Sequence, residues 1–370
     1  MSEQPLVFGA GLTASELEGV AQTSDWSRWI ERERAPRSGD GAGFRKTWHD
    51  DLALLADLGL TEVMITLEWA RLWPTQKTPS QEEIEFRCDL LRRATDLGMT
   101  PWACIVDGTL PGWFADDERG FTDDKARRLL WPRHVDWVGE TFGDLVGGWV
   151  PMREPRQWAA WGHLVGATPP GLQRRRDMQK MTAAIGQAEL DAERLLRGSA
   201  PVATYVTGRG VVGERDNVKA APHARWLGEH LSSDWLHQLA DGNARDAFNR
   251  VVVQLRPPIM VDADGAWHPV PGGTTAAAVL DGLDPAIEAS GDRTVVAAGD
   301  LAEQSADGAS GSEYLELVFE GIRERRAIGW WQASPIDGWH WQHGLERSPG
   351  LFDRGRGARM AVNTFPGPPI

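Results

Sequence analysis

Short apolar runs alternate along the chain with longer stretches of helical periodicity. The runs are rich in Val, Ile, Ala and Trp, which is typical of strands buried on both faces. They predict strands at 6–10, 62–67, 101–106, 149–152, 202–206, 251–255, 294–298 and 328–333. The intervening periodicity predicts helices at 48–58, 84–97, 123–142, 178–196, 224–239, 274–283 and 313–325.

Strands and helices therefore alternate at a spacing of roughly forty residues, as in a (β/α)₈ barrel. An α/β chain of this length could also form two doubly wound domains, but no Pro/Gly/Ser-rich linker divides it. We expect one barrel domain over residues 1–370. In such a barrel, functional side chains lie at the C-terminal ends of the strands.

The segment 149–155, WVPMREP, places a carboxyl group at such a strand end. Its apolar start predicts a buried strand, and Pro155 ends the strand directly after Glu154. In an apolar, Trp-rich barrel mouth the pKa of Glu154 would be raised, as a general acid requires. The alternative is a surface glutamate at a strand-to-loop corner, and this segment alone does not choose between them.

The composition limits the expected binding partners and the expected cellular location of the protein. The chain has 53 acidic and 39 basic residues and a net charge of −14, so nucleic acid is an unexpected partner. No apolar run approaches the ~18 residues of a membrane span, and the N-terminus lacks the pattern of a signal peptide. The only cysteines, Cys88 and Cys104, favour a reducing cytoplasm without disulfides.

The sequence contains no recognisable cofactor or metal motif. Phosphate-binding glycine loops, HExxH and paired cysteines are all missing from it, so we expect neither cofactor nor metal. The 19 tryptophans suit stacking against sugar rings, although ordinary core packing explains any single one equally well. A small molecule is the expected partner.

Several motifs, in the same order along the chain, resemble glycoside hydrolase family 1, the β-glucosidase family of retaining (β/α)₈ enzymes. Residues 8–19, FGAGLTASELEG, resemble the family's WGAATAAYQIEG, and 153–155, REP, stand at its NEP. The other matching segments are 49–59 (HDDLALLADLG), 68–74 (EWARLWP), 162–171 (GHLVGATPPG) and 336–341 (IDGWHW).

The resemblance assigns roles to individual residues. It implies that Glu154 is the acid/base, that Arg71 is the partner of the nucleophile and that Trp341 is a stacking platform. The family's nucleophile motif TENG corresponds here to 296–299, VAAG, with Ala297 at the nucleophile position. Asp300 and Glu303 follow closely but fall outside the motif. Double displacement would therefore lack one of its two carboxyl groups.

The sugar-contacting positions of the family are also changed. The matched residues that differ from the family pattern are Glu16, Asp107, Arg153, Arg256 and His340, which replace Gln, His, Asn, Tyr and Glu. Together with Arg71 this makes three guanidinium groups, and arginine suits bidentate capture of carboxylate or phosphate. Either the substrate is anionic, or the new arginines and acids pair with one another.

Three classes of function remain open. The first is a glycoside-active enzyme in which Glu154 donates a proton and water activated by Asp107 or Glu16 completes the displacement. The second is other acid–base chemistry on a small metabolite, such as cyclisation, elimination or isomerisation. The third is a binding protein that has lost turnover, because one barrel hosts many functions. Ordinary retaining β-glucosidase activity is expected to be weak or absent.

Overall fold

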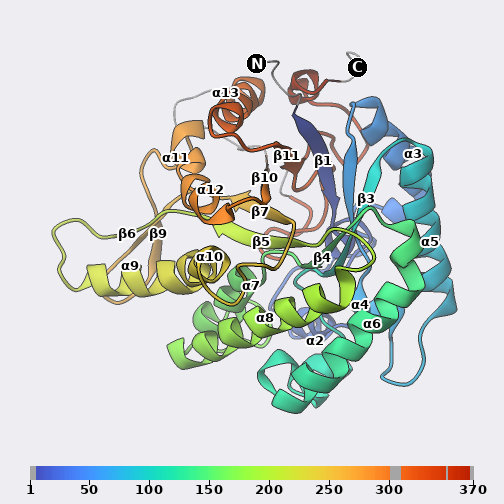
Figure 1. Cartoon of the computed structure of the whole chain (residues 1–370), viewed down its shortest axis with the longest axis horizontal. Coiled ribbons are helices and arrows are strands. Elements are labelled where there is room, and N and C mark those ends of the chain that lie inside the picture. Colours follow the sequence, from blue (N-terminus) through green and yellow to red (C-terminus); the bar gives the residue numbers. More distant parts are fainter. Residues whose placement is uncertain (1–5, 301–309, 347–348, 367–370) are drawn as a thin grey trace.

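Eight parallel strands form a closed barrel in the computed structural model, which describes residues 6–300, 310–346 and 349–366 (Figure 1). The barrel strands are β1 (Val7–Leu12), β2 (Glu62–Thr66), β3 (Thr100–Val106), β4 (Gly148–Met152), β5 (Ala203–Gly208), β7 (Arg250–Leu255), β10 (Thr294–Gly299) and β11 (Gly329–Gln332). Their order is β4-β3-β2-β1-β11-β10-β7-β5, and a parallel bridge between Trp149 and Val202 closes the ring. The predicted α/β barrel is confirmed.

Helices surround this barrel, as expected for the fold. The longer ones are α2 (Asp25–Glu31), α3 (Phe44–Asp57), α5 (Gln81–Asp96), α6 (Trp131–Phe142), α8 (Arg175–Leu196), α9 (Ala220–Gly228), α10 (Asp234–Ala240), α12 (Asp284–Ser290) and α13 (Gly311–Glu324). The short ones are α1 (Ala14–Leu17), α4 (Trp69–Leu72), α7 (Pro155–Ala160) and α11 (Ala276–Leu280). No helix in the described ranges is long and apolar enough to cross a membrane.

Several elements depart from the sequence-based expectation. The helix expected at 224–239 is divided into α9 and α10 by a π-helical turn at Glu229–Ser233. Further π turns lie at Trp113–Asp117, Ala126–Leu130 and Trp161–Val165, and 3-10 turns at Gly120–Thr122, Gly143–Leu145 and Met360–Thr364. A small sheet of β6 (Val211–Gly213), β8 (Ile259–Val261) and β9 (Trp267–Pro269) was not predicted, because three-residue strands carry too little periodicity.

Large side chains and one ion pair fill the barrel toward the N-terminal ends of its strands. Trp331 points inward across β1, where a Cβ at Gly9 would lie 2.5 Å from its ring. Arg250, at the start of β7, contacts Glu62, at the start of β2, at 2.6 Å and lies 4.3 Å from the Trp102 ring centroid. The barrel is therefore packed at this end, and any site must lie at the other.

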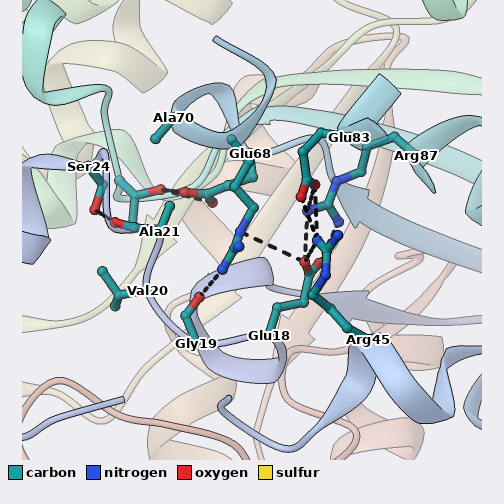
Figure 2. A network of polar contacts seen from close by, with 12 residues as sticks. Glu18, Gly19, Val20, Ala21, Ser24, Arg45, Glu68, Ala70, Glu83 and Arg87 are labelled. Atoms are coloured by element: carbon teal, nitrogen blue, oxygen red, sulfur yellow. Dashed lines mark hydrogen bonds and ion pairs between the residues drawn. The ribbon is translucent and has the colours of Figure 1, made fainter. Parts of the chain in front are cut away.

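A buried ion network joins the loop after β1 to the surrounding helices. Arg87 of α5 donates to Glu18 at 2.9 Å, and Arg45 of α3 donates to the same carboxylate at 3.1 Å. Figure 2 shows Arg45 and Arg87 converging on Glu18 and Glu83. Burial alone would raise the pKa of Glu18, but the arginines around it lower the pKa below its usual 4.5. This network holds in place the segment that carries Glu16.

Replacing Arg87 by Met should destabilise the protein by about 3 kcal/mol, because it removes the most buried partner of Glu18. Urea unfolding of the variant against native protein measures this. Since Glu18 has a lowered pKa when folded, its contribution is present at neutral pH and is lost as pH falls through that value. Arg92→Met, which removes an exposed pair with Asp89, is the control and should change stability by at most about 0.5 kcal/mol. Equal effects of the two variants would contradict the structural role.

Candidate active site

A cavity of about 880 Å³ opens at the C-terminal ends of the barrel strands. We call this cavity the mouth. Most residues singled out from the sequence line it, namely Glu16, Asp107, Arg153, Glu154, Arg256, His340 and Trp341. These residues come from positions that range from 16 to 341 along the chain, and the barrel brings them together at one end. No set of three His, Cys, Asp or Glu side chains in the described ranges is arranged to hold a metal ion.

Glu154 occupies a strained position at the end of β4. It is buried and adopts a left-handed backbone conformation with φ 44°, directly before Pro155 starts α7. For a residue other than glycine this conformation costs about 1–3 kcal/mol, and such residues cluster at functional sites. The alternative of a surface glutamate is therefore wrong.

Arg256 holds the Glu154 carboxylate through two contacts. Its Nε donates to Oε1 at 2.7 Å, and its Nη2 contacts Oε2. Burial by itself would raise the pKa of Glu154, but Arg256, helped by Arg153 and Arg209, lowers the pKa below its usual value. The predicted rise in the pKa of Glu154 is wrong, because the mouth is lined by guanidinium groups as well as tryptophans.

A second pair forms between Arg153 and Asp107. Arg153 donates to Thr13 Oγ1 at 2.7 Å and lies 3.4 Å from Asp107, which also accepts from Thr66 at 3.1 Å. The substituted arginines and acids therefore pair with one another, which was one of the two alternatives left open by the sequence. This pairing does not account for every charge in the mouth, because Arg209 has no such partner among the residues that the structure describes.

The pKa of Glu16 is shifted in the opposite direction to that of Glu154. Desolvation is the largest cause that raises the pKa of Glu16 to about 7; Arg153 counteracts it, and Asp300 and Asp107 add to it. The nearest hydrogen-bond donor is the Ser334 hydroxyl, at 3.0 Å. Glu16 is therefore partly protonated at neutral pH, whereas Glu154 is ionised.

Arg71 does not line this cavity. Its Nη2 donates to the Gly19 carbonyl at 2.6 Å, and its Nε lies 3.8 Å from Glu18. Arg71 thus belongs to the buried network beneath the mouth. The substrate contact expected of Arg71 stays a prediction, because the side chain is engaged by Gly19 and lies beside Glu18.

Ala297 does not face the mouth either. Along β10, Val296 and Ala298 pack in the barrel interior, whereas Ala297 belongs to the outer core between strands and helices. Because side chains alternate along a strand, Asp300 follows on the inner face and lines the mouth. Ala298, the next residue, faces the barrel interior and has no carboxyl group either, so the loss of the motif's carboxyl stays a prediction. Asp300 is a carboxyl group at this strand end that lines the mouth. Glu303 lies outside the described residues.

Aromatic rings form one wall of the mouth. Trp341 lies 6.4 Å from Trp26 and 5.4 Å from Trp161, measured between ring centroids. His340 contacts the rings of Trp341 and His343 and exchanges backbone hydrogen bonds with Gly344. A tryptophan face at the edge of a polar cavity suits a sugar ring, which presents C–H groups on one face.

Two charged mouth residues were given no role from the sequence, where Asp300 was noted only as lying outside the nucleophile motif. Arg209 follows the end of β5 directly, and Asp300 follows the end of β10. The only signal in the sequence is their place after an apolar strand, which many surface residues share. Their inward direction depends on the register of each strand, and a one-residue error reverses it.

The whole fold is similar to solved glycosidases. A β-glycosidase from Pyrococcus horikoshii superimposes with a TM-score of 0.82 at 16% identity, covering 96% of this chain and 92% of that one. A family 1 β-glucosidase from Thermotoga maritima gives 0.81 at 14% identity, covering 98% and 97%. At such identities the likeness establishes the fold.

The family model for glycosyl hydrolase family 1 matches residues 6–197, more than half of the chain. The chain belongs to glycosyl hydrolase family 1. Among its relatives, beta-glucosidase 11 of Arabidopsis thaliana is 28% identical over 173 residues, which are 44% of this chain and 33% of that protein. Hydroxyisourate hydrolase of Glycine max is also 28% identical, over 44% of this chain and 30% of its own length. The matched region thus spans about a third of these relatives.

Replacing Arg256 by Met should raise the pKa of Glu154, because burial then acts without its strongest opposing charge. Carboxyl ¹³C NMR titration measures this, with Glu154→Gln identifying the signal. Arg119→Met, which removes an exposed partner of Asp123 at the cavity rim, should leave the titration unchanged. A Glu154 pKa equal to that of native protein in Arg256→Met would refute the electrostatic account.

Proposed function

We propose that this family 1 protein is a glycosidase-like enzyme that performs acid–base chemistry on a sugar-containing small molecule. The observation that carries the proposal is the opposite shift of two carboxyl groups in one cavity, upward at Glu16 and downward at Glu154. Groups whose environments separate their pKa values in this way can serve as acid and base at the same pH. Trp341 provides a stacking surface beside them.

Glu16 is the better proton donor of the two in the ligand-free site. Its pKa of about 7 leaves a large protonated fraction at neutral pH. Glu154, kept ionised by Arg256, suits the role of a base that activates water. Glu154 could donate a proton, as the family resemblance implies, only after Arg256 moves away from it. Asp107 remains a second candidate base, although Arg153 offsets its charge.

Asp300 provides a candidate nucleophile. It follows the seventh barrel strand on its inner face and adds to the electrostatic field felt by Glu16 and Arg256. With Asp300 in the mouth, the chain no longer lacks a carboxyl group at this strand end. Double displacement through Asp300 is therefore the route we favour over direct attack by water.

A second candidate is acid–base chemistry on a small molecule that is not a glycoside. The similarity to hydroxyisourate hydrolase of Glycine max, whose name denotes a different substrate, favours it. A binding protein without turnover is the third, favoured by the two ion pairs that offset charge in the mouth. Activity on the substrates below separates the first candidate from the other two.

The cellular location, the number of domains and the partner are proposed from the composition and from the alternation of strands and helices along the sequence. A cytoplasmic location and a single domain over residues 1–370 stay predictions. A small molecule remains the proposed partner, in keeping with a net charge of −14 that disfavours nucleic acid.

Glu16→Gln should lower kcat/KM on alkyl β-glycosides, whose poor leaving group needs a proton, by about 10²- to 10⁴-fold, because the amide cannot donate the catalytic proton. In the native enzyme kcat/KM should fall as pH rises through about 7, as Glu16 of the free enzyme loses its proton, and the variant should lack this limb. Initial rates across pH measure both effects. Glu320→Gln, on the exposed face of α13, is the control. An unchanged alkaline limb in Glu16→Gln would remove Glu16 from this role.

A 2-deoxy-2-fluoro-β-glycoside with an activated leaving group should form a stable ester with Asp300, because the fluorine slows both displacements and the leaving group speeds only the first. Peptide mass spectrometry locates the label, and Asp300→Asn should abolish it. A label on another residue, or an inverted anomeric product seen by NMR, would exclude Asp300 as the nucleophile.

A further inference from the structure

Arg209 is a guanidinium in the mouth that has no counter-ion in the part of the chain that the structure describes. Within the described ranges, no group accepts a hydrogen bond from Arg209 and no carboxylate lies within ion-pair distance of it. Its Nε is buried without a partner. By contrast, Arg153 bonds to Thr13 and Asp107, and Arg256 bonds to Glu154. Arg209 lines the same cavity as these residues.

This isolation costs free energy. Burial and the neighbouring charge of Arg256 lower the pKa of Arg209 to about 10, so the side chain remains charged at neutral pH. A cation that is partly removed from water and placed beside a like charge is stabilised when an anion approaches it. Glu154 contributes some attraction, but its two oxygens are engaged by Arg256.

Arg256 has an unused edge close to Arg209. The two residues follow Gly208 and Leu255, which are paired across β5 and β7, and the Arg256 amide donates to the Gly208 carbonyl at 2.9 Å. Arg256 uses Nε and Nη2 for Glu154, which leaves Nη1 available. The ends of two neighbouring strands thus present guanidinium donors to the same part of the cavity.

We propose that Arg209, with the free edge of Arg256, binds an anionic group, a carboxylate or a phosphate, carried by the substrate. This inference rests on the proposed function for its catalytic consequence, but the binding of the anion stands without it. Arginine is suited to such groups because its planar donors match two oxygens at once. The carboxylates of Asp107 and Glu154 repel an anion little, since each is already held by an arginine.

The same arrangement makes the site selective. A neutral glycoside would leave Arg209 charged, partly desolvated and unpaired in the complex. A site built around an unpaired polar group rejects ligands that lack the complementary group more strongly than it rejects ligands of slightly different size. The enzyme should therefore prefer an anionic glycoside over a neutral one of the same shape.

Isothermal titration calorimetry with inorganic phosphate tests the binding step without requiring turnover. Native protein should bind phosphate, and Arg209→Gln should weaken the affinity by about tenfold or more, as expected for a charge-assisted hydrogen bond. Arg209→Lys should retain part of the affinity. Arg119→Gln removes an equally charged side chain at the rim, where it pairs with Asp123, and should bind like native protein. No binding by native protein, or equal affinity in Arg209→Gln, would overturn the proposal.

Steady-state kinetics then identify which anionic group, carboxylate or phosphate, the site binds. The substrates are 4-nitrophenyl β-glucoside, the matching β-glucuronide with a carboxylate and the 6-phospho-β-glucoside. Native enzyme should show the highest kcat/KM with one of the two anionic substrates, and Arg209→Gln should reduce that preference by about ten- to a hundredfold while sparing the neutral substrate. A preference for the neutral substrate that Arg209→Gln leaves unchanged would overturn it.

The two proposals fail in distinguishable ways. If none of the three glycosides is turned over but phosphate binding depends on Arg209, the hydrolytic function is wrong and the anion site stands. If the glycosides are turned over and phosphate binding is independent of Arg209, the anion site is wrong and the function stands.

Discussion

The contact between Arg256 and Glu154 determines the chemistry of the mouth. Glu154 is delivered by a strained residue at the end of a buried strand, in surroundings whose low polarity would by themselves favour its protonated form. Burial is the largest single influence on this pKa, but Arg256 at hydrogen-bond distance, together with Arg153 and Arg209, outweighs it and favours the carboxylate. Glu16, with a pKa of about 7, is therefore the partly protonated carboxyl group at neutral pH, and no arginine among the described residues makes a comparable contact with it.

Charge pairing also organises the rest of the barrel. Glu62 and Arg250 occupy its N-terminal end, and Glu18 with its arginines lies between the β1 loop and helices α3 and α5. In each case a buried carboxylate has a positive partner, as is required when ions are removed from water. Arg209 is a positive charge without such a partner among the described residues. We therefore assign it to ligand binding and not to a structural ion pair.

Two ion pairs lie at positions where the family resemblance predicts changed sugar contacts. Arg153 lies opposite Asp107, and Arg256 lies opposite Glu154. Changes that compensate one another preserve a folded, polar cavity while altering which group holds the proton. Such a site differs from one in which catalytic residues have simply been lost, because its carboxyl groups remain in the cavity and their pKa values are separated.

Much of this protein followed from the sequence alone. The spacing of apolar runs determined the barrel, and the ordered motifs indicated the family and placed Glu16, Asp107, Arg153, Glu154, Arg256, His340 and Trp341 at one end of it. These features depend on local periodicity, which a sequence displays directly.

Tertiary structure decided the partner of each charge and the face on which each strand residue lies. Arg71 lies beside Glu18 and does not line the cavity, and strand register places Ala297 in the outer core and Asp300 in the mouth. Arg209 showed its isolation only in three dimensions, because pKa and pairing depend on distances between residues far apart in the chain.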